Sequence, residues 1–128
     1  MIHCRNQVGV RVWLATQPVD MRRSFDGLAE HVRAFLGDDP LSGSMFVFRN
    51  RSSQRVKILW WDKDGLAIYY KRLEKGTFQF PAAGEKAVAI DSAALMRLLS
   101  GLKPEPPAAG AAHAARRERS MRVHPARA

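Results

Sequence analysis

The sequence contains a single cysteine, Cys4, so no disulfide bond can form within the chain. Chains without disulfides are typical of reducing compartments. No stretch approaches the ~20 apolar residues that a membrane span needs. The N-terminal segment MIHCRNQVGV also lacks the apolar core of a secretory signal. We therefore expect a soluble, cytoplasmic protein with no membrane partner.

The motifs of common catalytic sites are absent as well: there is no glycine-rich phosphate loop, GxSxG elbow or HExxH. Cys4 and the four histidines are scattered without metal-ligand spacing. Asp62 and Asp64, next to Gly65, could hold Mg²⁺ with further ligands. Aspartates in such a position also open turns by bonding their own backbone. We favour the turn and expect no metal, no cofactor and no enzymatic activity.

Acidic residues are few compared with basic ones: 12 Asp and Glu stand against 21 Lys and Arg, a net charge of +9. The 128 residues are 46% hydrophobic, which is enough for one domain with a packed core. A basic balance of this size favours a polyanionic partner, nucleic acid before membrane surfaces. The alternative is a solvated basic surface without a partner.

The fold prediction is built around Arg49–Lys75, where two apolar runs rich in Val, Ile, Trp and Tyr flank a short turn that ends in Gly65. We interpret this stretch as a β-hairpin in a small, mostly antiparallel sheet of an α+β domain without alternating βαβ units. The other predicted elements are strands at 8–15, 45–49 and 87–90, a short edge strand at 76–81, a long helix from Pro18 to Leu36, and a C-terminal helix at 92–100 that Asp91 caps.

The composition changes at Lys103, after which Ala, Pro and Arg dominate. This segment has too few large apolar residues to offset the entropy of ordering it. We therefore predict a domain at residues 1–102 and a flexible tail at 103–128. The tail carries +4 of the net charge, so the predicted domain is basic in its own right.

Candidate nucleic-acid contacts are the basic residues in and around the hairpin, together with an arginine pair at the predicted start of the long helix. In the first group, the loop Arg49–Arg55 can reach phosphates without disturbing the core. In the second, free backbone N–H groups and two guanidiniums could hold a phosphate, or Asp20 or Asp26 could neutralise the pair. The candidates are Arg22, Arg23, Arg49, Arg51, Arg55, Lys57, Lys71 and Arg72.

Four aromatic residues, Trp60, Trp61, Tyr69 and Tyr70, alternate with basic residues in the hairpin. If exposed, they could stack bases or form part of a protein interface. If buried, they are the core of a small sheet, which we expect for at least half of them.

Several segments together resemble a known family, in the same order and spacing, between about Val10 and Leu102. They are TQPVDMRRSFDGL at 16–28, FVFRNR at 46–51, KILWWD at 57–62, DG at 64–65 and YKRLE at 70–74. The chain resembles the TnpB-type, Orf-two-like accessory proteins of bacterial insertion sequences of family sixty-six.

This resemblance implies a non-catalytic role in transposition beside a separate transposase subunit of the same element. Together with the charge, it leads us to expect binding to DNA at the element ends, and hence association with the nucleoid. The alternative is a protein-interaction module that assembles or regulates the transposase without touching DNA. Homo-oligomer formation stays open at this point.

Overall fold

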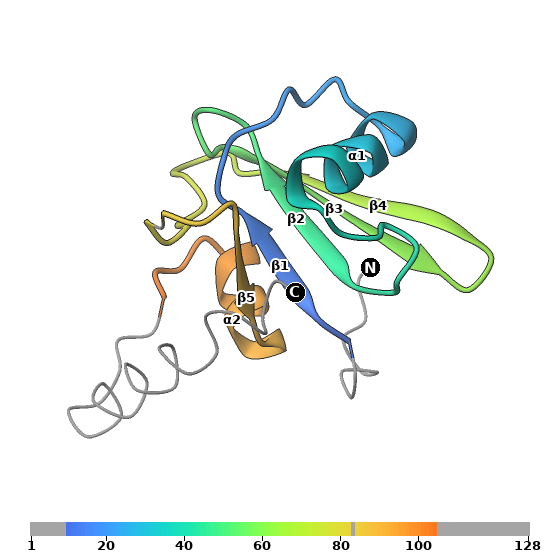
Figure 1. Ribbon diagram of the computed structural model, residues 1–128. Helices are drawn as coiled ribbons and strands as arrows, with labels where there is room; N and C mark the ends of the chain where they lie inside the picture. Colours follow the sequence, from blue (N-terminus) through green and yellow to red (C-terminus); the bar gives the residue numbers. More distant parts are fainter. Residues whose placement is uncertain (1–9, 83, 105–128) are drawn as a thin grey trace.

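The computed structural model describes residues 10–82 and 84–104. Its centre is a five-stranded sheet with the strand order β4-β3-β2-β1-β5 (Figure 1). Three helical segments accompany the sheet. In chain order the elements are β1 (Val12–Ala15), α1 (Phe25–His31), η1 (Val32–Leu36), β2 (Met45–Arg49), β3 (Arg55–Asp62), β4 (Gly65–Arg72), β5 (Ala87–Ile90) and α2 (Ser92–Leu99).

The sheet is mixed. β1 and β2 run parallel, while the β1–β5, β2–β3 and β3–β4 pairs are antiparallel. Because α1 and η1 connect the two parallel strands, the chain contains one βαβ unit. The prediction excludes an alternating series of such units and does not anticipate this single one. The α+β class stands, since helix and strand do not alternate elsewhere.

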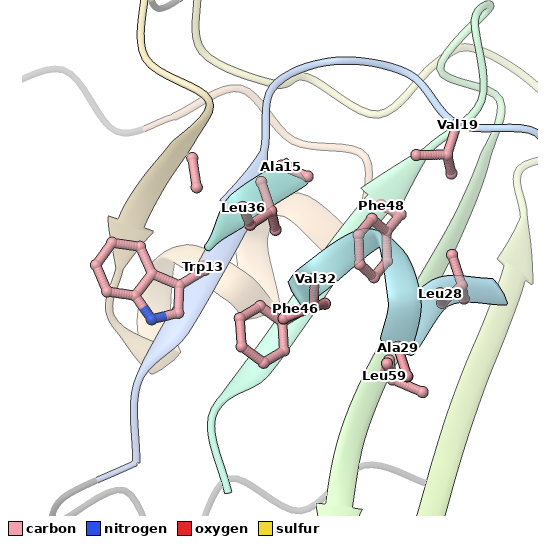
Figure 2. Close-up of a cluster of buried hydrophobic side chains, with 11 residues drawn as sticks. Trp13, Ala15, Val19, Leu28, Ala29, Val32, Leu36, Phe46, Phe48 and Leu59 are labelled. Carbon is pink, nitrogen blue, oxygen red and sulfur yellow. The ribbon is translucent and has the colours of Figure 1, made fainter. Parts of the chain in front are cut away.

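Helices cover both faces of the sheet (Figure 1). Side chains alternate along each strand, so neighbouring residues pack on opposite faces. One face carries Val47, Val56 and Ile58 against the leucines of α2. The other carries Trp13, Phe46, Phe48 and Leu59 against Leu28, Val32 and Leu36 of α1 and η1 (Figure 2). This second cluster packs α1 and η1 against the sheet.

The helix after β1 is shorter than predicted, because α1 and η1 together span only Phe25–Leu36. Residues 18–23 are not helical, and within them Met21 and Arg22 form a turn. The Asp20 carboxylate accepts a hydrogen bond from the Arg22 backbone N–H at 2.9 Å, and the Asp20 carbonyl accepts one from the Arg23 N–H at 3.1 Å. An aspartate that bonds its own backbone in this way competes with helix formation. The predicted stop at Gly37 is confirmed, with φ 67° in the left-handed region.

Most of the remaining element predictions agree with the structure. β2 and β5 have the predicted bounds, β3 and β4 form the predicted hairpin within 49–75, and the Asp91 side chain caps α2 by accepting from the Ala94 N–H. Residues 76–81 do not form the predicted edge strand, because Phe78 turns into the core, with 2% of its surface exposed.

Two further predictions meet the limits of the described residues. The first strand begins only at Val12, and the start of its predicted range lies outside the described residues. The predicted tail lies outside them from residue 105 onward. No helix within the described ranges has the length and apolar character to cross a membrane.

Candidate nucleic-acid interface

An open groove of about 670 Å³ lies where the β2–β3 loop meets the connection between β1 and α1. Its cationic lining residues are Arg22, Arg51 and Arg55, and Asp20 is its acidic one. The sequence analysis places Arg22 and the loop arginines in two separate patches. The structure brings them together in one groove with a net charge of +2.

The β2–β3 loop presents its arginines from a well-bonded turn. The Asn50 side-chain oxygen accepts from the Arg55 N–H at 3.0 Å, and the Asn50 N–H donates to the Arg55 carbonyl at 3.1 Å. Ser53 has φ 60°, and its carbonyl accepts from the Phe78 N–H at 2.7 Å. Arg51 is exposed on this turn. These hydrogen bonds therefore hold the loop, and the arginines on it, in one conformation beside the groove.

Arg55 and Tyr70 both line the groove and contact each other. Arg55 Nη1 donates to the Tyr70 hydroxyl at 3.2 Å, across the β3–β4 pair. Tyr70 is 47% exposed, although it lies on an otherwise packed face. The sequence analysis names Tyr70 for stacking or an interface but does not place it beside Arg55. Asn50 and Ser52 also line the groove; their only sequence signal is turn composition.

Lys57 does not line the groove but bonds the segment that brings Met21 and Arg22 to it. Its ammonium donates to the carbonyls of Met21 at 2.8 Å and Arg23 at 2.6 Å, and it lies 4.7 Å from the Tyr70 ring centre. Only 7% of Lys57 is exposed. The prediction that Lys57 contacts phosphate does not fit this placement, because its donors serve the 21–23 segment. Lys57 is a positioning residue for the groove.

Arg49 is also engaged inside the protein. Its Nη2 donates to the Thr16 carbonyl at 2.7 Å, its Nη1 donates to the Ser53 hydroxyl at 3.3 Å, and its guanidinium lies over the Phe80 ring. The Arg49 carbonyl in turn accepts from the Val19 N–H at 2.9 Å. As with Lys57, the predicted phosphate contact gives way to a structural role, which is to join the end of β2 to the segment after β1.

The remaining predicted cations differ in placement. Lys71 faces α2 and donates to the Leu99 carbonyl at 2.7 Å, so it lies on the face opposite to the groove. Arg72 is exposed, pairs with Glu74 at 3.1 Å, and stands opposite Arg55 in the sheet. Arg23 is exposed and lies 3.1 Å from His31 Nδ1. Arg72 and Arg23 are thus peripheral to the groove.

Asp20 pairs with Arg22 through Arg22 Nη2 at 2.7 Å and Arg22 Nε at 3.1 Å. Hydrogen bonds from the Arg22 side chain and then from its backbone N–H lower the pKa of Asp20 from 3.8 to about 2. The carboxylate therefore stays ionised at any physiological pH. An anion that enters the groove has to compete with Asp20 for Arg22.

The four aromatic candidates do not form one patch, because alternation divides them between the two faces of the sheet. Trp60 and Tyr69 pack against the core on the α2 side. Trp61 and Tyr70 belong to the α1 side, where Trp61 is half-buried. Of the four, Tyr70 alone is available to the groove.

Asp62 and Asp64 belong to the tight turn between β3 and β4, in which Asp62 pairs with Gly65. The Asp64 N–H donates to the Asp62 carbonyl at 2.6 Å, and Lys63 adopts φ 63°. These are features of the turn that we favour from the sequence. Among the residues that the structure describes, no group of three or more His, Cys, Asp or Glu side chains comes close enough together to hold a metal ion.

The lowered pKa of His31 should make the stability of the protein depend on pH. Burial, and then the nearby Arg23 guanidinium, lower the pKa of His31 below its ordinary 6.5. As pH falls through 6.5, the unfolded chain takes up this proton before the folded chain does. The stability that neutral His31 provides is therefore complete above about pH 6.5 and decreases from there toward its folded-state pKa.

We expect the melting temperature of the wild type to fall more steeply between pH 7 and pH 5 than that of a His31→Phe variant. Phenylalanine keeps the stacking on Phe35 and the edge contact with Phe48 but cannot titrate. His3, His113 and His124 are present in both proteins, so the difference isolates His31. Equal slopes would show that His31 does not titrate differently on unfolding.

Comparison with known proteins assigns the family. The family model for IS66 Orf2 like protein matches residues 10–109. The chain belongs to the IS66 Orf2-like family. The family match includes every element of the sheet and the whole groove, and it runs past the predicted domain end at residue 102.

Two curated proteins from Sinorhizobium fredii are similar to this chain. "Uncharacterized protein y4hO" is 46% identical over 93 residues, covering 73% of this chain and 81% of the relative. "Uncharacterized protein y4jC" is 38% identical over 94 residues, covering 73% and 80%. No solved structure gives a significant match to the chain.

Proposed function

We propose that this IS66 Orf2-like chain is a non-catalytic accessory protein of insertion-sequence transposition that binds DNA through its cationic groove. The observation that carries the proposal is the convergence of Arg22, Arg51 and Arg55 from distant parts of the chain. Its natural partners would be the ends of the element and a separate transposase subunit.

The lining of the groove suits a sugar–phosphate backbone. Guanidinium groups bind phosphate oxygens in a bidentate manner and stay charged at all physiological pH values. Asn50 and Ser52 add amide and hydroxyl donors of the kind that commonly contact phosphates. Tyr70 adds an exposed aromatic ring, on which an unpaired base can stack.

The second candidate function is a protein-interaction module that joins transposase subunits without DNA contact. Trp61 and Tyr70 favour it, because both keep exposed surface on the face beside α1. Capture of the transposase from extract with and without nuclease separates the two functions. Loss of the complex after nuclease treatment supports the DNA-binding proposal, and survival supports direct contact.

Removing the acidic charge of the groove is expected to increase DNA binding. Asp20→Asn keeps the acceptor for the Arg22 N–H but removes the charge that competes for the Arg22 guanidinium. We expect the affinity for duplex DNA to rise by up to about 8-fold near ~0.1 M salt, the equivalent of one additional phosphate contact. Fluorescence anisotropy with a labelled duplex measures this directly.

Asp39→Asn is the matched control. It makes the same charge change in the loop before β2, at the other end of the sheet, and its side-chain oxygen can still accept from the Leu41 N–H. An equal gain in both variants would mean that net charge, and not the groove, governs binding.

A further inference from the structure

β4 forms one margin of the sheet, and no strand within the described residues pairs with its outer side (Figure 1). Edge strands are commonly protected by proline, bulges or inward-pointing charges. β4 contains no proline over its eight residues, GLAIYYKR, and pairs with β3 without a bulge. Its two charges, Lys71 and Arg72, stand at its C-terminal end, and of these Lys71 points inward to the α2 side. The outer edge of β4 is therefore able to pair with another strand.

The phase of the hydrogen bonds defines which groups this edge offers. The Leu73 N–H donates to the Gln54 carbonyl at 3.0 Å, next to the Arg55–Arg72 pair. Bonded residues alternate in an antiparallel pair, so the odd-numbered residues of β4 face β3. The N–H and C=O groups of Leu66, Ile68, Tyr70 and Arg72 consequently point outward.

Charge along β4 suits a second copy of the same chain. Asp64 precedes one end of the strand, and Arg72 ends the other. A two-fold axis that pairs β4 with itself runs the two copies antiparallel and brings each acidic end to a basic end. Arg72 stands opposite Arg55 in its own sheet and pairs with the exposed Glu74, so Asp64 of the second copy would be a second acidic neighbour for it.

Two registers near the middle of the strand let the outward-facing N–H and C=O groups of the two copies bond each other. The charges at the strand ends distinguish these two registers. A pairing centred on Ile68 sets Leu66 opposite Tyr70 of the second copy and Asp64 opposite Arg72. A pairing centred on Tyr69 sets Asp64 opposite Glu74, which are like charges. The first register also places an aliphatic side chain, Leu66 of the second copy, beside the edge of the Tyr70 ring on the same face.

We propose that two copies of this chain join through their β4 edges, antiparallel and centred on Ile68, into one continuous ten-stranded sheet. The occupant of the edge is thus a second copy, and the contact is made of main-chain hydrogen bonds, two Asp64–Arg72 pairs and two Leu66–Tyr70 pairs. The proposal does not rest on DNA binding, so its failure and the failure of the proposed function are separate.

Sedimentation velocity of the full chain, without DNA, tests the proposal. The wild type is expected to sediment as a dimer, twice 14.4 kDa. Arg72→Glu and Asp64→Arg each place like charges at both ends of the interface and should weaken the dimer roughly 10-fold or more. The double swap restores opposite charges and should restore the dimer. Both sites are exposed, so the fold is expected to be retained, and far-UV circular dichroism checks this.

Each other outcome overturns the proposal. A monomeric wild type at ~100 µM leaves no self-association in the range of ordinary dimer affinities. Asp64→Arg that strengthens the dimer indicates the register centred on Tyr69, where residue 64 meets Glu74. A dimer that neither single variant weakens lies elsewhere on the molecule.

Discussion

Replacing Arg22, Arg51 and Arg55 together with Gln is expected to lower the affinity for duplex DNA by roughly 100- to 1,000-fold near ~0.1 M salt. Each guanidinium that neutralises a phosphate releases a condensed counterion, and three such contacts account for a factor of this size. The three side chains line one groove and reach it from two segments that pack against each other. Anisotropy titration of a labelled duplex, in parallel with an unfolding curve, measures the effect.

A charge-matched control accompanies this variant. Arg11, Arg33 and Lys63 are exposed and lie at the start of β1, in η1 and in the β3–β4 turn, away from the groove. Their replacement by Gln also removes three positive charges, but none of them from the groove. We expect this control to bind within a few-fold of the wild type. Equal losses in the two triple variants would contradict a role for the groove in particular.

Replacing Lys57 with Met is expected to lower the free energy of unfolding by about 2–4 kcal/mol. Methionine fills much of the same space, but the Met21 and Arg23 carbonyls lose the donors at 2.8 and 2.6 Å. The cation–π contact with Tyr70 is lost as well. The 21–23 segment, which carries Arg22, then loses its bonds to β3. DNA affinity should therefore fall even though Lys57 itself is buried. Urea unfolding gives the change in free energy.

The control for this variant is Lys63→Met, which removes one exposed charge and should leave the free energy of unfolding unchanged within about 0.5 kcal/mol. The two roles considered for Lys57 have different signatures. If Lys57 contacted phosphate, its replacement by Met would reduce the salt dependence of DNA binding and leave the free energy of unfolding unchanged. A positioning residue lowers stability first, and that is the outcome the structure supports.

The strands could be predicted from the sequence because their signals are local. Val56–Trp61 and Leu66–Tyr70 carry strand-forming residues on either side of a turn that ends in Gly65, and Asp91 caps a run of leucines. The βαβ unit could not be read in the same way. The parallel pairing of β1 with β2 depends on where α1 packs. The residues of the two strands do not indicate this packing.

The helix start shows a local competition that the apolar pattern conceals. Pro18 and Asp20 are favourable in a first helical turn, and Met21 and Phe25 continue the spacing. The Asp20 side chain instead bonds the backbone N–H of Arg22, so the helix begins only at Phe25. The same contact pairs Asp20 with Arg22, one of the two outcomes that the sequence leaves open.

The candidate site was predictable in composition but not in accessibility. Arg51 and Arg55 belong to a basic hairpin loop, which is visible in the sequence. Nothing in the sequence separates Arg55 from Lys57, two residues further on the same face of β3, yet Lys57 is buried beneath the 21–23 segment. Long-range carbonyl partners decide which cations remain free for an anion, and these partners appear only once the chain is folded.

The most direct test of the cationic groove is the salt dependence of DNA binding by the full chain. A plot of log affinity against log salt concentration should be linear, with a slope steeper by about 2.7 for the wild type than for the Arg22, Arg51 and Arg55 triple variant. The two lines should converge near ~1 M salt, where counterion release no longer contributes. Parallel lines, or a wild type that does not bind duplex DNA at low salt, would contradict the account.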